Sequence, residues 1–458
     1  MKRLSKYIPV LSVFTLALLI RIIYNVTVAR NYVPIFDAAL YQGLAEHLVD
    51  QGCFCLHGQI SSVSRPPFWP FIMSIIFWFS GKEEFSARLF YCFLGSGTCI
   101  MIYFLAKRFF GGKIALVSGI AAALYPCLFI YDGWLYTESL YTFLLTACVL
   151  LLVHIQHAPL EQEKASGKSW LARIWQLVWR QKWPILGGLL IGATTLTRPN
   201  GILLLGVVVL WAMLISLAKL RPWRTTLKDV VLMAGIALLL IAPWTYRNYR
   251  VSHSFVLVSM GAGEVLAGAY NDVVLNGDPA VRGRWRPTPN SLNHDSVTYT
   301  PKDDAADTAR ALAWMRTHLS SLPILFGLHF VNMWEPYTYA HGLPFEIPPH
   351  QADFDFMVAL ITVTTYLVIF LAIVGLLLTW KRLKRELLPV YLLLGCIILQ
   401  NIAFYSDMRF RAPVEPLLLV LAGGALWGLF SFQKQLWSRW QKRPKETSPL
   451  PKSELALK

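Results

Sequence analysis

Charged side chains are scarce in this sequence. Asp, Glu, Lys and Arg make up 15% of the 458 residues, while hydrophobic residues make up 55% and the mean hydropathy is +0.48. These values lie outside the usual range of soluble globular domains. They indicate a polytopic membrane protein, whose length allows about ten spans of roughly 20 residues and one sizeable region outside the membrane.

Acidic residues are fewer than basic ones, 26 against 42, and the formal net charge is +16. A charge of this sign can indicate a nucleic-acid partner. Here, however, Lys and Arg lie in short clusters between apolar segments and form no single basic domain. We therefore interpret the clusters as topology signals and expect no nucleic acid among the partners.

Cysteine is also scarce, and the seven cysteines show no zinc-type spacing. Cys53 and Cys55 flank one phenylalanine near His57, which leaves a metal site there as an alternative. The other five fall mostly within apolar runs, where a cysteine packs as a small hydrophobe. We assign no metal ligands from the sequence, and the cofactor, including a divalent metal, stays unknown.

Five basic clusters orient the chain, because Lys and Arg are enriched on the cytoplasmic side of membrane proteins. They lie at 107–113, 164–182, 219–228, 381–386 and 434–445. If all five are cytoplasmic, both termini are cytoplasmic. The spans then fall near 8–28, 87–106, 114–131, 138–157, 184–197, 201–219, 229–245, 357–380, 387–405 and 412–432. The sequence thus predicts an all-α integral protein of the plasma or inner membrane with about ten transmembrane helices.

The segment "PPFWPFIMSIIFWFSG" at 66–81 is apolar, yet it would break this charge pattern if it crossed the membrane. It is short for a span, and apolar segments of about 10–14 residues are more often re-entrant or interfacial. We place it as a juxtamembrane helix on the outer face. Residues 31–86 then form one outer loop that begins with Asp37 and also carries an amphipathic helix.

A second outer region is expected at 246–353, where acids roughly balance bases. It contains the turn-rich "NGDPAVRGRWRPTPN" and a helix from Asp303 to about Leu319. The chain then divides into an N-terminal transmembrane catalytic module, this outer region, C-terminal transmembrane helices and a disordered cytoplasmic tail, at 1–245, 246–353, 354–432 and 433–458.

On this topology, ionisable side chains from distant segments converge at the outer membrane boundary. They are Asp37, Arg65, Glu138, Arg198, Arg247, Arg409 and Arg411. Ionisable residues at membrane depth are costly, so their convergence indicates a functional site. A carboxylate can accept a proton from an attacking hydroxyl, while guanidinium groups pair with phosphate oxygens and neutralise a leaving phosphate. This chemistry suits a donor with a phosphosugar head and a lipid tail.

Several segments also carry a family resemblance. The pattern "D...Y..LA..L...G" comprises Asp37, Tyr41, Leu44, Ala45, Leu48 and Gly52, and "RPPFWP" follows it. It resembles the polytopic GT-C glycosyltransferases, which include protein O-mannosyltransferase-like and aminoarabinose-transferase-like enzymes that use polyprenyl-phosphate sugars. The segments "GIAAALYPCLFIYDGWLYTESLY", "LTRPNG", "APWTYRNY" and "RFRAPVEPLLLVLAG" resemble that family in the same order, so the resemblance covers roughly residues 8–430.

The resemblance implies a glycosyltransferase that moves a sugar, with inversion, from a polyprenyl-phosphate donor to a glycan, lipid or protein acceptor of the cell envelope. Asp37 matches the catalytic carboxylate of the first loop, and Glu138 matches a second acidic position. The family often has two adjacent acids in the first loop, whereas Ala38 follows Asp37 here. This departure argues against a metal site of the two-acid type.

Six residues are predicted to bind the lipid phosphate or the sugar. The resemblance assigns Arg198, Arg247 and Arg411, and their positions in the same outer segments add Tyr41, Arg65 and Arg409.

These residues also have simpler interpretations. Asp37 sits where a helix N-cap would sit, and Glu138 can favour a helix start through the helix dipole. The arginines can act as interfacial anchors, and Arg21 in the first span can snorkel or pair with a neighbouring helix. Trp69, Trp134 and Trp244 can stack on a sugar. A secondary transporter or a non-catalytic assembly protein also stays open, although the sequence shows no repeated halves.

Overall fold

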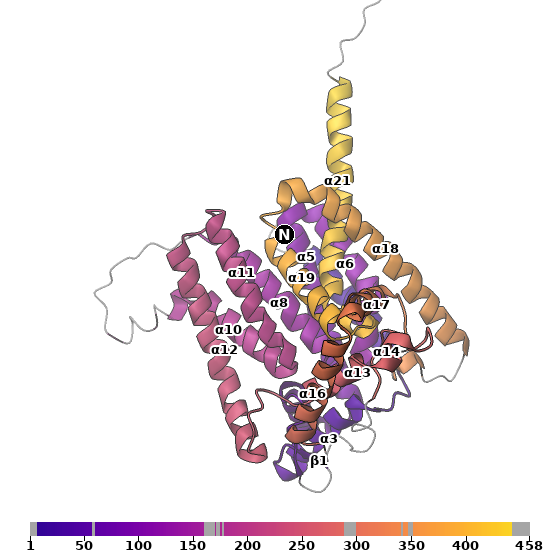
Figure 1. Cartoon of the computed structure of the whole chain (residues 1–458). Coiled ribbons are helices and arrows are strands. Elements are labelled where there is room, and N and C mark those ends of the chain that lie inside the picture. Colours follow the sequence, from indigo (N-terminus) through magenta and orange to yellow (C-terminus); the bar gives the residue numbers. More distant parts are fainter. Residues whose placement is uncertain are drawn as a thin grey trace, which may run out of the picture.

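The computed structural model describes residues 7–56, 60–159, 170, 175, 178–287, 299–339, 342–346 and 351–441. Within these residues the chain is almost entirely helical, and the only strands are β1 (Cys55–Leu56) and β2 (Ile60–Ser61), which pair antiparallel. Long helices form the body of the molecule, and shorter elements gather at its lower end (Figure 1). The predicted all-α fold class is confirmed. His57, His341 and most of the 164–182 cluster lie outside the described residues.

Helices occupy all ten predicted span positions. They are α2 (Ile8–Val26), α5 (Glu84–Phe110), α6 (Gly112–Leu124) with α7 (Pro126–Phe129) and η1 (Ile130–Gly133), α8 (Glu138–His157), α10 (Lys182–Thr197), η2 (Pro199–Ile202) with α11 (Leu203–Leu217), α12 (Trp223–Ser252), α18 (Gln351–Leu383), α19 (Leu388–Ala403) and α21 (Glu415–Gln441). Among the described residues, seven helices are long and apolar enough to cross a membrane, and the bent α6 pair makes an eighth. Because α10 and α19 have only 16 residues each, the predicted number of ten is approximate.

The bend after α6 has a local cause in the sequence. The axes of α6 and the following α7–η1 segment meet at 70°. Tyr125 lies between them with an extended backbone (ψ 115°), and Pro126 follows. Proline has no N–H to continue the helical ladder, and it disfavours helical backbone at the residue before it. The bend brings Asp132, in η1, against α2 and the start of α8.

The segment predicted as the first outer loop contains the two short helices expected for it, α3 (Asp37–Gln51) and α4 (Phe68–Ser80). α3 ends at Gly52, whose φ of 66° is a left-handed conformation that glycine adopts without strain. The cap at the start of α3 is the backbone of Phe36, and no side chain caps that end, so the N-cap interpretation of Asp37 is not supported. Cys53 and Cys55 form a disulfide, which removes both sulfurs from any metal site.

The region predicted as the second outer region contains several short helices. They are α13 (Ala262–Ala269), α14 (Asp272–Asn276), α16 (Pro301–Thr317), η3 (Leu319–Ser321), α17 (Leu322–Trp334) and η4 (Pro344–Glu346). α16 confirms the helix predicted from Asp303, because Thr300 and Asp303 form a capping box at its start. α12 and α18 both extend into residues 246–353. α21 likewise continues to Gln441, past the predicted start of the tail.

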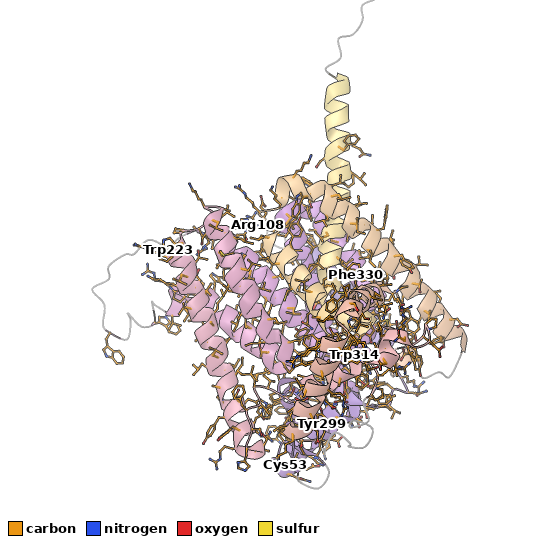
Figure 2. The ribbon with its side chains drawn as sticks, viewed as in Figure 1. Cys53, Arg108, Trp223, Tyr299, Trp314 and Phe330 are labelled. Carbon is orange, nitrogen blue, oxygen red and sulfur yellow. A yellow bond between two sulfur atoms is a disulfide. The ribbon has the colours of Figure 1, made fainter. Side chains whose placement is uncertain are left out.

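The connections between long helices separate into two groups at opposite ends. Gln156 at the end of α8 donates to the backbone of Arg385 over 2.8 Å, which joins two connections that the sequence assigns to the inner side. At the other end, the Met260 amide donates to the Val63 carbonyl over 2.9 Å and ties the two outer regions together. Figure 2 shows the same division, with Arg108 and Trp223 toward the upper end and Cys53 and Tyr299 at the lower end.

Candidate active site

Asp37 is the first residue of α3, and both of its carboxylate oxygens face arginines. Arg65, in the turn before α4, donates to Oδ1 over 2.7 Å, and Arg409 donates to Oδ2 over 3.4 Å. The Asp37 side chain is 30% exposed. Burial by itself raises the pKa of this carboxyl, but the charges and hydrogen bonds of Arg65 and Arg409 outweigh burial and hold the pKa below its ordinary value. Asp37 is therefore an ionised and paired carboxylate in this arrangement.

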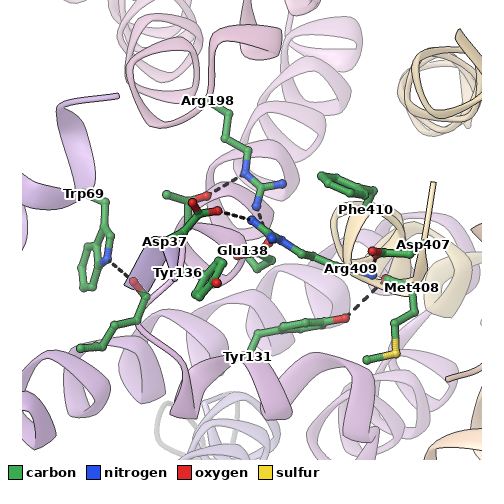
Figure 3. Close-up of polar contacts among 12 residues, drawn as sticks. Asp37, Trp69, Tyr131, Tyr136, Glu138, Arg198, Asp407, Met408, Arg409 and Phe410 are labelled. Carbon is green, nitrogen blue, oxygen red and sulfur yellow. Dashed lines mark hydrogen bonds and ion pairs between the residues drawn. The ribbon is translucent and has the colours of Figure 1, made fainter. Parts of the chain in front are cut away.

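Glu138 is the first residue of α8, at the outer end predicted for it. Its side chain is 1% exposed, and its Oε1 accepts from both Arg198 and Arg409. Its Oε2 is buried and has no hydrogen-bond partner among the residues that the structure describes. The simple helix-start interpretation does not account for two guanidinium partners on a single oxygen. Glu138 and Asp37 share Arg409, so the two carboxylates belong to one cluster (Figure 3).

The arginines of this cluster lie in short segments that connect the long helices. Arg198 follows α10 with an extended backbone (φ −146°, ψ 131°), because the residue before Pro199 avoids helical geometry. Its Nε donates to the Thr137 hydroxyl over 2.7 Å. Arg409 lies in the short helix α20 (Met408–Arg411), whose N-cap Asp407 accepts from the Arg409 amide over 2.7 Å. Both arginines are thus held at element ends, where side chains of separate helices can meet.

Aromatic rings pack against the Arg409 side chain of the cluster. The Arg409 guanidinium lies 4.5 Å from the centre of the Tyr136 ring and 5.4 Å from that of Trp134. Trp134 and Tyr136 stack on each other at 3.6 Å. Such contacts favour a cation over the ring faces and limit its motion. Trp69 and Trp134 are both fully buried, so the prediction that they stack on a sugar is wrong.

The balance of charge indicates what this site can bind. Three guanidinium groups, of Arg65, Arg198 and Arg409, face two carboxylates. The cluster keeps an excess of positive charge and a partly exposed side at Asp37, which suits an anion with several oxygens. A divalent cation fits poorly, since both carboxylates already bind arginines. The described part of the chain contains no group of three or more His, Cys, Asp or Glu side chains placed to hold a metal ion.

Tyr41 lies one turn after Asp37 on α3 and is buried beside the cluster. Burial, together with the negative charge of Asp37, raises the pKa of its hydroxyl to about 12. Tyr41 therefore stays protonated at neutral pH and can donate a hydrogen bond.

Arg411 and Arg247, which the sequence placed with the phosphate-binding residues, lie outside this cluster. Arg411 is 1% exposed, pairs with Glu415 over 2.6 Å and donates to the carbonyls of Met333 and Glu335. Arg247 donates to the carbonyls of Ser62 and Phe54 and so ties α12 to the first outer loop. These guanidinium groups already have protein partners, so the structure gives them structural contacts and does not bring them into the Asp37 cluster.

The sequence interpretation missed one buried carboxylate near the cluster. Asp132 accepts from Arg21 Nε over 2.7 Å and from the Ser139 hydroxyl over 2.6 Å, and both members of the ion pair are buried. The prediction that Arg21 pairs with a neighbouring helix is confirmed. The signal for Asp132 was present, since an aspartate in an apolar run needs a buried partner and Arg21 was available.

Known proteins share this architecture. The sequence profile of the family described as dolichyl-phosphate-mannose-protein mannosyltransferase matches residues 64–246, less than half of the chain. No curated protein matches the sequence. The archaeal oligosaccharyltransferase AglB from Archaeoglobus fulgidus, solved with an inhibitory peptide and a dolichol-phosphate, is 14% identical with a TM-score of 0.56 over 97% of this chain and 53% of that chain. The chain has a GT-C fold.

Two further structures resemble this GT-C chain. A structure of the Archaeoglobus fulgidus oligosaccharyltransferase with Zn and sulfate is 11% identical, has a TM-score of 0.51, and is matched over 94% of this chain and 52% of that one. ArnT from Cupriavidus metallidurans, bound to undecaprenyl phosphate, is 16% identical over 95% of this chain and 81% of that one. Its TM-score of 0.43 is too low to add to the fold assignment. The chain spans about half the length of the oligosaccharyltransferase.

Proposed function

We propose that this chain is a membrane glycosyltransferase. It moves a sugar from a polyprenyl-phosphate-linked donor to a glycan, lipid or protein acceptor of the cell envelope, on the outer face and with inversion. The observation that carries the proposal is the cluster of three arginines around Asp37 and Glu138. The oligosaccharyltransferase with the same fold was solved with a dolichol-phosphate, which belongs to the class of lipid phosphate that the proposed donor would release.

The guanidinium groups would bind the donor phosphate and stabilise the charge that develops on it. As the bond between the sugar C1 and the phosphate oxygen breaks, polyprenyl phosphate leaves as an anion, and anion stabilisation at that moment lowers the barrier. Arg65 and Arg409 would shift from Asp37 toward the phosphate. Losing these partners raises the pKa of the Asp37 carboxyl, because their charges are what hold it low.

The Asp37 carboxylate would then act as general base. It takes the proton of an acceptor hydroxyl while the acceptor oxygen forms its bond to C1 on the face opposite the phosphate. One displacement of this kind inverts the configuration at C1. Glu138 would hold Arg198 and Arg409 in place, since its Oε1 contacts both. An acceptor that is already an anion would need no base, and Asp37 would then only orient the arginines.

The proposal includes a topology and a division of the chain. The basic connections and both termini would be cytoplasmic, and the Asp37 cluster would lie on the outer face of a plasma or inner membrane. The 1–245 part would be the main catalytic module, with the outer region and the C-terminal helices following it. Arg409 comes from between α19 and α21, so the C-terminal helices also supply a site residue.

The first experiment measures release of polyprenyl phosphate from a mixed pool of polyprenyl-phosphate sugars, with cell-envelope lipids and glycans as acceptors. Membranes with wild type, Asp37→Asn or Asp50→Asn are compared at equal protein levels. Asp50 is a matched control, because it lies near the end of the same helix and pairs with Lys82 at the surface. We expect release by wild type and Asp50→Asn, and a fall of about 10²–10⁴-fold in Asp37→Asn.

The other outcomes point elsewhere. Equal release by wild type and Asp37→Asn would keep the enzyme but reject Asp37 as its base. No release by folded wild type, from a pool that a known transferase can use, would reject the enzyme and favour a transporter or an assembly protein.

A further inference from the structure

We propose that a cavity between the outer ends of α2 and α5 binds the headgroup of a membrane phospholipid that carries a phosphate and a primary ammonium. The cavity has a volume of about 550 Å³. Its lining includes Asn25, Arg30, Tyr32, Lys82, Glu83 and Arg88. None of these residues belongs to the Asp37 cluster.

Arg88 is the main reason to expect an anion in this cavity. Its side chain is buried, with the residue only 5% exposed, and it donates to the Ala29 carbonyl over 2.6 Å and to Asn25 over 3.4 Å. Its Nε is buried without a hydrogen-bond partner in the described part of the chain. Arg88 forms no ion pair within 4.0 Å of any described carboxylate, whereas the buried Arg21 and Arg411 both do. Its opposite charge is Glu84, one turn earlier on α5 and also in the cavity lining, which acts on it without a direct ion pair.

A buried cation without a directly bonded counter-ion is costly, and an anion that enters the cavity can offset this cost. Arg30 is exposed at the rim, and Lys82 lies in the turn before α5, where it pairs with Asp50 over 2.7 Å. Together these residues give a phosphate group the buried Arg88 and the exposed Arg30, while Lys82 is already paired.

The acidic residues of the cavity lining indicate which group the ligand carries besides its phosphate. Glu83 is exposed at the N-cap of α5, and Glu84 begins that helix and accepts from Gln42 over 3.2 Å. Carboxylates repel a bare phosphate but pair with an ammonium that can donate hydrogen bonds. A headgroup with both charges therefore fits this lining better than a simple anion does.

The position of the cavity favours a lipid as the source of this headgroup. Ile23 and Val26 near the end of α2 are 56% and 47% exposed, and Phe85 at the start of α5 is 38% exposed. These apolar side chains would face acyl chains beside a polar cavity at a helix end, which is where headgroups lie. Tyr32 lines the cavity, and its hydroxyl accepts from the Leu135 amide at 3.4 Å.

The test is native mass spectrometry of the purified full chain in nanodiscs made from phosphatidylethanolamine, phosphatidylcholine and phosphatidylglycerol in equal parts. We expect wild type to retain phosphatidylethanolamine selectively. Arg30→Gln should lower its retention about tenfold, because one charge-assisted contact is lost. Glu83→Gln should keep phosphate binding but lose the preference for a primary ammonium over choline. Arg316→Gln, an exposed arginine of α16, is the matched control and should behave as wild type.

Both variants change exposed side chains, so folding is expected to be unaffected, and unfolding midpoints check this. Equal retention of the three lipids by wild type, or unchanged retention in both Arg30→Gln and Glu83→Gln, would overturn the proposal. Competition separates the possible sources of phosphate. Displacement of the lipid by millimolar inorganic phosphate would show a site for free phosphate and overturn the lipid assignment, while resistance to it supports the lipid.

Discussion

Two groups of arginine–carboxylate contacts lie close together in this molecule. They differ in burial, in charge balance and in whether all their polar atoms have partners. The Arg21–Asp132 pair is buried on both sides, has one charge of each sign, and is completed by Ser139 and the carbonyls of Ala17 and Leu128. The Asp37 cluster has more arginines than carboxylates, is partly exposed, and leaves Glu138 Oε2 unpaired among the described residues.

The difference separates a structural ion pair from the proposed binding site. A balanced and fully bonded pair has no capacity left for a ligand, and its value lies in joining α2 to η1 and α8. An unbalanced cluster at the surface can exchange its carboxylate partners for a ligand anion. The Arg411–Glu415 pair is likewise buried, balanced in charge and bonded to backbone carbonyls. Residue type alone therefore does not decide between the two roles, but charge balance and exposure do.

Removing the carboxylate of the Arg21–Asp132 pair should have the largest effect, which is a loss of folding stability. Asp132→Ala leaves Arg21 buried without its counter-ion, which costs about 3–5 kcal/mol of folding free energy. We expect a large drop in the thermal unfolding midpoint in detergent, or too little folded protein to purify.

The double variant Arg21→Met with Asp132→Ala tests the cause. It removes both charges, and most of the lost stability should return. An unfolding midpoint of Asp132→Ala equal to that of wild type would contradict the structural role of the pair.

In the Asp37 cluster, Arg409→Gln should reduce activity more than stability. Arg409 contacts both Asp37 and Glu138, and a donor that stabilises developing charge is worth about 10²–10³ in rate. Release of polyprenyl phosphate at saturating donor measures this. Arg250→Gln, at an exposed arginine of α12, should retain wild-type rates. A normal rate in Arg409→Gln would remove Arg409 from the site.

The next prediction concerns the packing of α5 against the Arg21–Asp132 pair. A Cβ at Gly95 on α5 would collide with the Asp132 carboxylate and the Arg21 guanidinium. Gly95→Ala should therefore destabilise the protein by about 1–3 kcal/mol. Gly206→Ala on α11 is the matched control, since a Cβ there meets no neighbour within 4 Å. It should be neutral or stabilising by up to about 1 kcal/mol. Equal unfolding midpoints for the two variants would contradict the close packing at Gly95.

The smallest expected effect is a shift in acid sensitivity. Arg65 and Arg409 hold the pKa of Asp37 below its ordinary value, so the folded state favours the ionised carboxylate. This contribution to stability is present above the unfolded pKa of about 3.9 and is lost as pH falls through the lower folded pKa. Wild type should thus keep its activity between pH 7 and 5 as far as Asp37 is concerned.

In Arg65→Gln the pKa of Asp37 should rise, and the acid limb of the pH–activity profile should move to higher pH. Arg250→Gln, at an exposed arginine of α12, should not move it. Superimposable acid limbs in wild type and Arg65→Gln would contradict the coupling between Arg65 and Asp37.

Much of the site followed from the sequence because membrane topology restricts where polar groups can lie. Once the basic loops were assigned to one side, Asp37, Glu138, Arg198 and Arg409 had to lie near one boundary. Arg247 and Arg411 met the same criterion, yet their guanidinium groups bind backbone carbonyls and Glu415. Topology places a residue at a boundary but does not choose its partner.

Hydropathy, charge distribution and proline positions are local properties, and they were enough to determine a polytopic helical protein, the positions of its long helices and the short helices of the first outer loop. Tertiary structure alone decided which arginine meets which carboxylate, that Trp69 and Trp134 are buried, and that Arg88 forms no direct ion pair with a described carboxylate. The physical reason is that an ion pair between residues such as Arg409 and Asp37 depends on distances between helices that are hundreds of residues apart in the chain. Such distances arise from packing of the whole bundle, which no local pattern encodes.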